Sequence, residues 1–276
     1  SSGNCYYLGT DQYAILIDAG IPVRTIQKVL RENGLSFSKI MAVLITHDHT
    51  DHIRSAGSLG ELYHLPVYST KAVHSGMERN YGMSKKLSAA SRRILERDVE
   101  FAIPGTDFRL TPFTVPHDST DNVGYYIEVG EEGETPVRFC LVTDCGYITS
   151  DIKDYLKKAD HIVIESNHDI DMLMHGPYPQ YLKQRVRGEG GHLSNMECAE
   201  LIHDIYHKSL KHLFLCHLSH ENNTPDIAYR SAEDALRKEG VRIGEEVVLS
   251  VLMRNSTSLV YTFSGSPKDS QLTLDF

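Results

Sequence analysis

The sequence has no long apolar segment, no excess of positive charge and no paired cysteine motif. No stretch approaches 18 consecutive apolar residues, which argues against a membrane-spanning helix, and no basic start followed by an apolar core marks a signal peptide. The net charge of −9, counted with neutral histidines, excludes the overall basic field of a protein that coats nucleic acid. Two divalent ions would bring it only to about −5, so any contact with nucleic acid must be local.

The five cysteines are an odd number and contain no C-x-x-C pair. We therefore expect reduced thiols in a cytoplasmic protein. Cys140, Cys145 and Cys216 sit beside candidate site residues, but we expect them to be small core residues in preference to metal ligands. The sequence starts without a methionine and runs straight into a predicted strand, so we expect a few residues, with any targeting signal, to precede Ser1 in the full protein.

The 276 residues, with 41% hydrophobic content, can bury a sizeable core, and no linker-like stretch divides them. We expect one domain over residues 1–263, built from two βα halves that face each other, and a loose polar tail over residues 264–276. Residues 71–97 have a polar, mostly helical pattern. We expect a helical insertion there, whose basic residues form either a nucleic-acid contact or an ordinary solvated face: Lys85, Lys86, Arg92, Arg93 and Arg97.

The densest polar cluster follows the apolar run from Met41 to Thr46, which predicts a buried strand. It reads His47-Asp-His49-Thr-Asp51-His52. Imidazole suits zinc, iron and manganese, carboxylate adds negative charge, and this spacing allows two ligands to face one ion and two another. Ordinary surface histidines at a strand-to-helix turn are the alternative, but so dense a cluster would repel its own protons without a cation. The cluster therefore predicts two metal ions.

Three more candidate ligands come directly after other predicted strands: His117, Asp144 and His217. Because sheet folds collect their sites at strand ends, we expect these side chains to meet the first cluster. The expected ligand sets are His47, His49 and His117 for one ion and Asp51, His52 and His217 for the other, with Asp144 bridging both.

Together these residues resemble the metallo-β-lactamase superfamily, whose α/β fold is a four-layered αββα sandwich. The resemblance covers nearly the whole chain. Asp18-Ala-Gly20 matches the early Asp-x-Gly turn of the superfamily, which implies that Asp18 supports the metal ligands from behind. Lactamases, glyoxalases, nucleases and oxidoreductases share the fold, so this resemblance does not fix the reaction.

Narrower motifs are Ser1-Ser-Gly-Asn-Cys5, Glu165-Ser-Asn167, Gly176-Pro-Tyr-Pro179, Gly191-His-Leu-Ser-Asn195 and His217-Leu-Ser-His-Glu-Asn-Asn223. They are similar to those of the YycJ/WalJ family, close to the tRNase Z-like phosphodiesterases. That resemblance implies a metal-dependent nuclease with 5′-to-3′ exonuclease action on double-stranded DNA.

Phosphodiester hydrolysis suits such a site, because two cations lower the pKa of an attacking water and neutralise phosphate oxygens. By resemblance to the tRNase Z pair, His192 oriented by Glu165 would protonate the leaving oxygen, and Asp51 is counted with them among the catalytic residues. His192 could instead only cap the helix that follows. Ser194 and Asn195, at the start of that helix, could offer donors to a phosphate.

Three cations precede the same loop: Lys183, Arg185 and Arg187. Their alternate positions suit a grip on a nucleic-acid backbone, although surface decoration is as good an interpretation. A small-molecule phosphodiesterase or other metallo-hydrolase would need no such basic footprint, and an RNA-processing nuclease is a further alternative. A non-catalytic binding protein should have lost ligands, and here all are present. We expect two divalent transition-metal ions, zinc or manganese, and duplex DNA as the partner.

Overall fold

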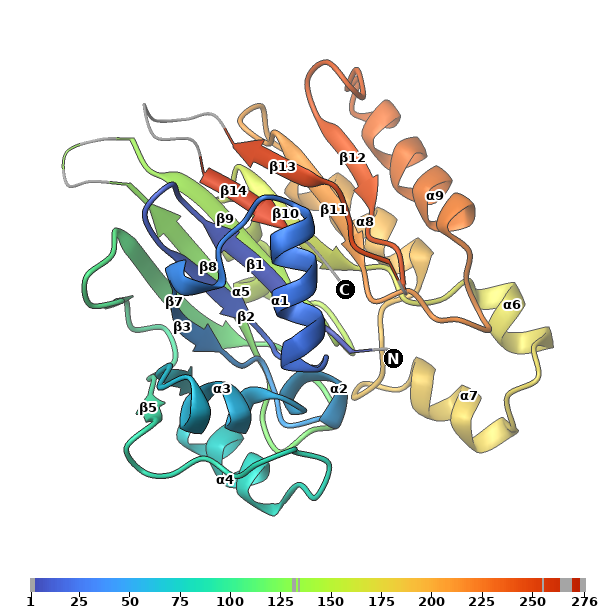
Figure 1. Cartoon of the computed structure of the whole chain (residues 1–276). Helices are drawn as coiled ribbons and strands as arrows, with labels where there is room; N and C mark the ends of the chain where they lie inside the picture. The colour runs from blue at the N-terminus through green and yellow to red at the C-terminus, as the bar shows by residue number, and fades with distance from the viewer. Residues whose placement is uncertain (1–2, 131–132, 134, 255, 264–269, 274–276) are drawn as a thin grey trace.

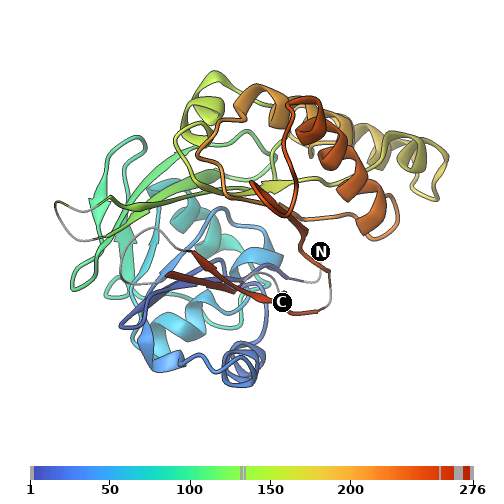
Figure 2. The ribbon, with the colours of Figure 1, turned by 90° about the horizontal axis from the view of Figure 1, so that it is seen from above.

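Two β-sheets pack face to face at the centre of the structure, and helices cover both outer faces (Figure 1, Figure 2). The computed structural model describes residues 3–130, 133, 135–254, 256–263 and 270–273. Within these residues each sheet has seven strands. The α/β fold predicted from the sequence, a four-layered αββα sandwich, is therefore confirmed.

The first sheet contains the strand that was predicted to deliver the metal ligands. Its strands β2 to β5 run parallel, whereas β1, β13 and β14 form antiparallel pairs. Helices α1 (Val23–Glu32), α3 (Ala56–Leu62) and α4 (Lys71–Arg79) lie on its outer side (Figure 1). In spatial order the strands are β13 (Val260–Phe263), β14 (Ser270–Thr273), β1 (Tyr6–Gly9), β2 (Ala14–Ile17), β3 (Ile40–Leu44), β4 (Val67–Ser69) and β5 (Arg92–Ile94).

The second sheet is antiparallel from β6 to β9 and parallel from β9 to β12. Helices α5 (Ser150–Leu156), α8 (Asn195–Ile205) and α9 (Pro225–Lys238) cover it, and α6 (Ile170–His175) and α7 (Gln180–Arg187) project from one end (Figure 1). Among the described helices, none is long and apolar enough to cross a membrane. The strands are β12 (Val248–Val251), β11 (His212–Cys216), β10 (His161–Glu165), β9 (Val137–Val142), β8 (Val123–Val129), β7 (Phe108–Thr114) and β6 (Phe101–Ala102).

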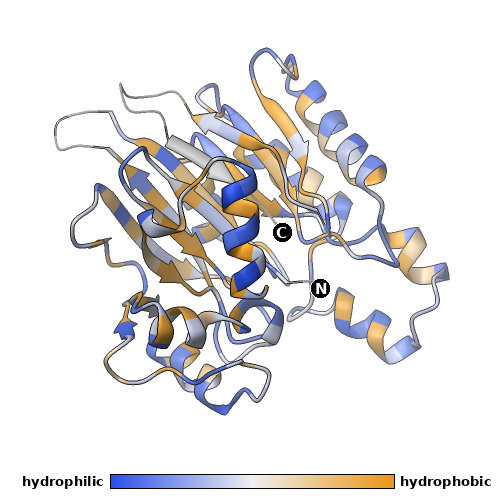
Figure 3. Cartoon of the chain, viewed as in Figure 1, coloured by the Kyte–Doolittle hydropathy of each residue, from blue (hydrophilic) through white to orange (hydrophobic). Residues whose placement is uncertain are grey.

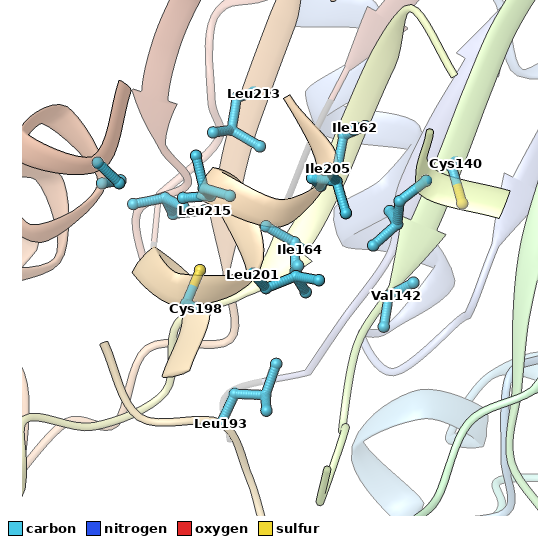
Figure 4. Packing of buried hydrophobic residues seen from close by; sticks show 14 of the residues in the cluster. Cys140, Val142, Ile162, Ile164, Leu193, Cys198, Leu201, Ile205, Leu213 and Leu215 are labelled. Carbon is cyan, nitrogen blue, oxygen red and sulfur yellow. The ribbon is translucent and has the colours of Figure 1, made fainter. Parts of the chain in front are cut away.

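The alternation of side chains along the strands explains the layering. On β10, Ile162 and Ile164 face the helices, whereas Val163 faces the other sheet. Fully buried residues such as these stabilise the fold by about 1.5–3 kcal/mol each. Figure 4 shows the helix side of this sheet, where Leu201 and Ile205 of α8 pack on it, and Figure 3 shows apolar residues concentrated on the strands. A strand buried on both faces therefore reads as a continuous apolar run.

Two segments differ from the expectations. Residues 71–97 form a helix only over Lys71–Arg79, and Arg92–Ile94 forms β5, the edge strand beside β4. Charged residues are common on edge strands, which is why the pattern misled the prediction of a fully helical insertion. In the predicted loose tail, Ser270–Thr273 forms β14 between β1 and β13, held by main-chain pairing that composition does not reveal. Residues 264–269 and 274–276 lie outside the described part of the chain.

Candidate metal centre

The candidate ligands gather at one end of the sandwich, where strands of both sheets finish. His47 follows β3, and His52 lies in the short helix α2 (Thr50–Ile53) immediately beyond. From the second sheet His117 follows β7, Asp144 follows β9 and His217 follows β11. The shared placement at strand ends, inferred from the sequence, is what brings these distant residues together.

Among the described residues, four overlapping groups of side chains have ligand atoms within 4.8 Å of one another, as in metal-ligand sets. Two of these groups contain Asp144: His47, His52 and Asp144, and Asp144, Glu165, His192 and His217. The other two are those expected from the sequence: His47, His49 and His117, and Asp51, His52 and His217. Asp144 lies between them. Its Oδ2 is 3.3 Å from Nε2 of His52, and its Oδ1 is 3.7 Å from Nε2 of His117 and 3.5 Å from Nε2 of His217.

Hydrogen bonds fix which ring nitrogen four of these histidines present to the centre. Nδ1 of His52 donates to Oδ2 of Asp18 at 2.7 Å, and Nδ1 of His117 donates to the carbonyl of Gly191 at 3.0 Å. Nδ1 of His217 donates to Oε1 of Glu165 at 2.7 Å. In each case Nε2 is left to bind an ion, which is how protein metal sites hold their histidines.

Nε2 is also the ring nitrogen of His47 that can bind an ion. The hydroxyl of Thr46 donates to the Asp18 carboxylate, so its oxygen accepts from Nδ1 of His47 at 3.0 Å. Nε2 of His47 is buried and has no hydrogen-bond partner among the described residues. A buried polar atom without a partner is costly, and a divalent cation shared with His49 and His117 would satisfy it.

The charges around His52 also suit a cation. Burial lowers the pKa of His52, but the carboxylates of Asp144 and Asp18 outweigh it and raise that pKa to about 10. The same carboxylate field that favours a proton at this position favours a metal ion. The residues present therefore fit the divalent metal that this donor set implies.

Asp18 occupies the supporting position expected of it. Its side chain is fully buried, and it accepts from the Thr46 amide at 2.9 Å as well as from His52. Asp18, Asp144 and His217 adopt left-handed backbone conformations, with φ of 60°, 53° and 56°. Such conformations are unfavourable for these residues and concentrate at functional sites.

Glu165 and His192 stand together at the edge of the centre. Oε1 of Glu165 accepts from Nδ1 of His192 at 2.8 Å, and Oε2 accepts from the amides of Cys145 at 2.8 Å and Leu193 at 3.2 Å. The imidazoles of His192 and His217 hold the pKa of the fully buried Glu165 far below its usual range despite desolvation. An ionised Glu165 in turn offsets the burial of His192 and raises the pKa of its imidazole to about 9.

Residues 13–217 match the family described as the beta-lactamase superfamily domain. The chain is 32% identical over 246 residues to the exodeoxyribonuclease YycJ of Bacillus anthracis, which covers 89% of each chain. It is 31% identical over 244 residues to the exodeoxyribonuclease WalJ of Streptococcus pneumoniae, which covers 88% of each. The chain belongs to the YycJ/WalJ family of the β-lactamase superfamily.

The structure of Zn(2+)-bound PqqB from Methylobacterium extorquens has the same fold, with a TM-score of 0.61 and 18% identity. The match covers 88% of this chain and 83% of PqqB. Membership of the superfamily and the donor set described above make this protein a metal-dependent hydrolase.

In this member of the YycJ/WalJ family, Ser194 and Asn195 do not present phosphate donors. Ser194 caps α8, with its side chain and that of Glu197 bonded reciprocally. The side chain of Asn195 bonds Ser166 and Asn223, and its amide donates to the carbonyl of His168. The substrate contact expected from the sequence is therefore replaced by a structural role.

The three cations before the His192 loop do not share one face, because they lie on the helix α7. Arg185 pairs with Asp118 through Nε to Oδ2 at 2.5 Å and Nη2 to Oδ1 at 3.0 Å. Lys183 and Arg187, four positions apart on the opposite side, contact Met174 of α6. Alternate positions would align on a strand, but on a helix they diverge, so the three side chains do not lie on one common face.

Two residues beside the metal centre were given no role in the interpretation of the sequence. Oδ1 of Asp118 lies 3.5 Å from Nε2 of His117 and 3.9 Å from Nε2 of His49. Nδ2 of Asn4 lies 2.8 Å from Nε2 of His52. Adjacency to His117 could have indicated Asp118, whereas Asn4 was only one member of the N-terminal motif. The cysteines are buried thiols, and burial raises the pKa of Cys145, as expected of a core residue.

Proposed function

We propose that this protein is a dinuclear metal-dependent phosphodiester hydrolase that degrades double-stranded DNA from its 5′ ends. The observation that carries the proposal is the contact of two ligand sets through Asp144, with a hydrogen-bonded histidine and glutamate at their edge. The exodeoxyribonuclease names of the two relatives support DNA as the substrate. We further infer a cytoplasmic location, supported by five buried thiols.

We assign one ion to His47, His49 and His117, and the other to Asp51, His52 and His217, with Asp144 shared between them. When bound, the ions, zinc or manganese, supply Lewis-acid polarisation of the phosphate and lower the pKa of the attacking water. Asp18 keeps His52 in the tautomer that binds metal through Nε2. Asp51, whose side chain is partly exposed, has the second role of orienting the attacking water.

His192 is the general acid in this proposal. Its Nδ1 is held by Glu165, and its side chain is 16% exposed, so Nε2 is the atom that can meet a substrate. A raised pKa keeps the imidazole protonated at neutral pH, which is the form that can give a proton to a departing 3′ oxygen. Glu165 stays ionised and stabilises the protonated imidazole of His192 before the proton is transferred.

A panel of substrates tests the proposal. We expect metal-loaded protein to degrade duplex DNA and to act more weakly on single-stranded DNA and RNA of the same sequence. Metal-free protein is the control, and activity must return when zinc or manganese is restored. Hydrolysis of short or cyclic phosphodiesters without any action on duplex DNA would instead identify a small-molecule phosphodiesterase.

A further inference from the structure

Asn4 lies beside the second ligand set, and the function proposed above gives it no part. Its side chain is buried, with 2% exposure, and Nδ2 lies 2.8 Å from Nε2 of His52. Because Nδ1 of His52 is engaged by Asp18, Nε2 is the atom through which His52 would bind an ion. The carboxamide of Asn4 therefore faces the metal position itself.

Main-chain hydrogen bonds hold Asn4 in this place. Its amide donates to the carbonyl of Asp51 at 2.7 Å, and its carbonyl accepts from the amide of Gly20 at 2.8 Å. These bonds join the N-terminal segment to α2 on one side and to the turn that carries Asp18 on the other. The carboxamide is consequently fixed relative to two expected ligands, Asp51 and His52.

Two glycines make this close approach possible. Gly3 has a φ of +111°, and a Cβ there would lie 2.6 Å from the carbonyl oxygen of Gly20. A Cβ on Gly20 would lie 1.6 Å from the carbonyl oxygen of Asp51. No other residue fits at either position without moving the backbone. The Gly-Asn pair in the N-terminal motif thus has a physical purpose, which is to bring Asn4 against the centre.

The groups around Asn4 show what it can add. Nε2 of His52 lies 3.3 Å from Oδ2 of Asp144 and 3.8 Å from Oδ2 of Asp51. These neighbouring carboxylates can only accept hydrogen bonds, and they repel anions. Asn4 is neutral and carries N–H donors. A ring nitrogen that binds an ion cannot accept a hydrogen bond, so with the metal present an N–H of Asn4 can donate to an oxygen brought in with the substrate.

We propose that Asn4 is a substrate-binding residue whose carboxamide N–H donates to a non-bridging oxygen of the phosphate at the metal centre. The inference rests on the phosphodiester chemistry proposed above. An alkyl side chain at this position would leave the phosphate oxygen without its donor, and a carboxylate would repel it.

Calorimetric titration of metal-loaded protein with inorganic phosphate tests this role without requiring turnover. We expect Asn4→Ala to keep the wild-type metal content, measured by elemental analysis, and to bind phosphate about tenfold more weakly. Asn4→Asp, which has nearly the same shape, should also keep its metal and should bind phosphate more weakly still. This order follows from the absence of a donor in the first variant and an added negative charge in the second.

Asn122→Ala is the matched control, because Asn122 is a buried asparagine that donates from Nδ2 to the carbonyl of Asp144 at 2.8 Å. It should lower the melting temperature but not the phosphate affinity of fully loaded protein. Unchanged phosphate affinity in Asn4→Ala would overturn the inference, and so would loss of metal from both Asn4 variants. Failure of the wild-type protein to bind phosphate would overturn the phosphodiester chemistry as well, whereas failure to cut DNA alone would contradict only the proposed nuclease activity.

Discussion

Nδ1 of His192 and Oε1 of Glu165 lie 2.8 Å apart in a partly buried hydrogen bond at the edge of the metal centre. The same oxygen accepts from Nδ1 of His217 at 2.7 Å. One carboxylate therefore orients both the expected acid and an expected metal ligand. Loss of the acid and loss of the metal can be separated only by changing the two histidines independently.

His192→Ala should reduce turnover about a hundredfold or more while leaving the metal content intact, a size typical of general acid catalysis. The comparison substrate is a nitrophenyl phosphodiester, whose leaving oxygen departs without a proton and should be far less sensitive to the change. Steady-state kinetics with elemental analysis gives both results. Loss of metal from His192→Ala would show that the residue is structural.

Turnover of DNA should fall as pH rises through the pKa of His192, because only the protonated imidazole can act as an acid. Burial lowers this pKa, and Glu165 offsets burial and raises it to about 9. Bound cations lower it again, so the fall should lie at or below pH 9. The measurement is the pH dependence of kcat.

Glu165→Gln removes the charge that sustains the raised pKa of His192, so the alkaline fall in kcat should move to lower pH, toward the ordinary histidine pKa of about 6.5. The nitrophenyl substrate serves as the internal control, since its hydrolysis should lack this fall in both proteins. An alkaline limb that stays in place after Glu165→Gln would mean that another group is responsible for it.

Two ions should bind per fully loaded chain, roughly 3.5–4 Å apart as in other two-metal hydrolytic sites. Asp144 lies 3.3–3.7 Å from histidines of both ligand sets, so Asp144→Asn should weaken both sites. His49 belongs to one set, so His49→Ala should first weaken one. Elemental analysis during graded chelation distinguishes the two patterns, and a wild-type content of one ion or fewer would contradict the assignment.

Removal of the metal should lower the melting temperature, because chelation leaves Nε2 of His47 buried without a partner among the described residues. An ion present at a hundred times its dissociation constant stabilises the folded state by about 2.7 kcal/mol per site. Differential scanning calorimetry before and after chelation should show this loss and its recovery with zinc. The Asp144→Asn variant should respond less, and equal responses would contradict the shared position of Asp144.

Neutralising Lys183, Arg185 and Arg187 together should weaken binding of long DNA and flatten its salt dependence, by roughly 0.9 in the log–log slope for each phosphate that the protein no longer neutralises. Arg185 is already paired with Asp118. The double variant of Lys183 and Arg187 tests whether Arg185 also contacts phosphate, because in that case it should show less than the full effect. Hydrolysis of a small phosphodiester should be unaffected. Equal damage to both substrates would assign the cluster a structural role.

Much of the fold could be predicted because buried strands such as β3 and β10 are short apolar runs that end in polar residues. β14 could not be predicted, since its place between β1 and β13 depends on main-chain pairing across the whole chain. At the break between α2 and α3 the hydroxyl of Ser55 donates to the carbonyl of Ile21, a contact between distant segments that the sequence does not reveal.

The seven expected ligands are brought together because strand ends converge in this fold, a rule that needs only the sequence. The geometry of the cationic cluster could not be predicted, since it depended on whether residues 183–187 were extended or helical. Asn4 was given no role because it contacts His52, a residue far along the chain. Asp118 was given no role because it contacts Arg185, on a helix whose direction the sequence does not reveal.

The most direct test of the central claim uses one blunt-ended DNA duplex labelled in separate samples at the 5′ or the 3′ end of the same strand. Metal-loaded protein should release the 5′ label at once as a mononucleotide or very short product, while the 3′-labelled strand shortens progressively. The metal-free protein and Asp144→Asn should do neither. Intact duplex in every sample despite two bound ions, or release of the 3′ label first, would contradict the account.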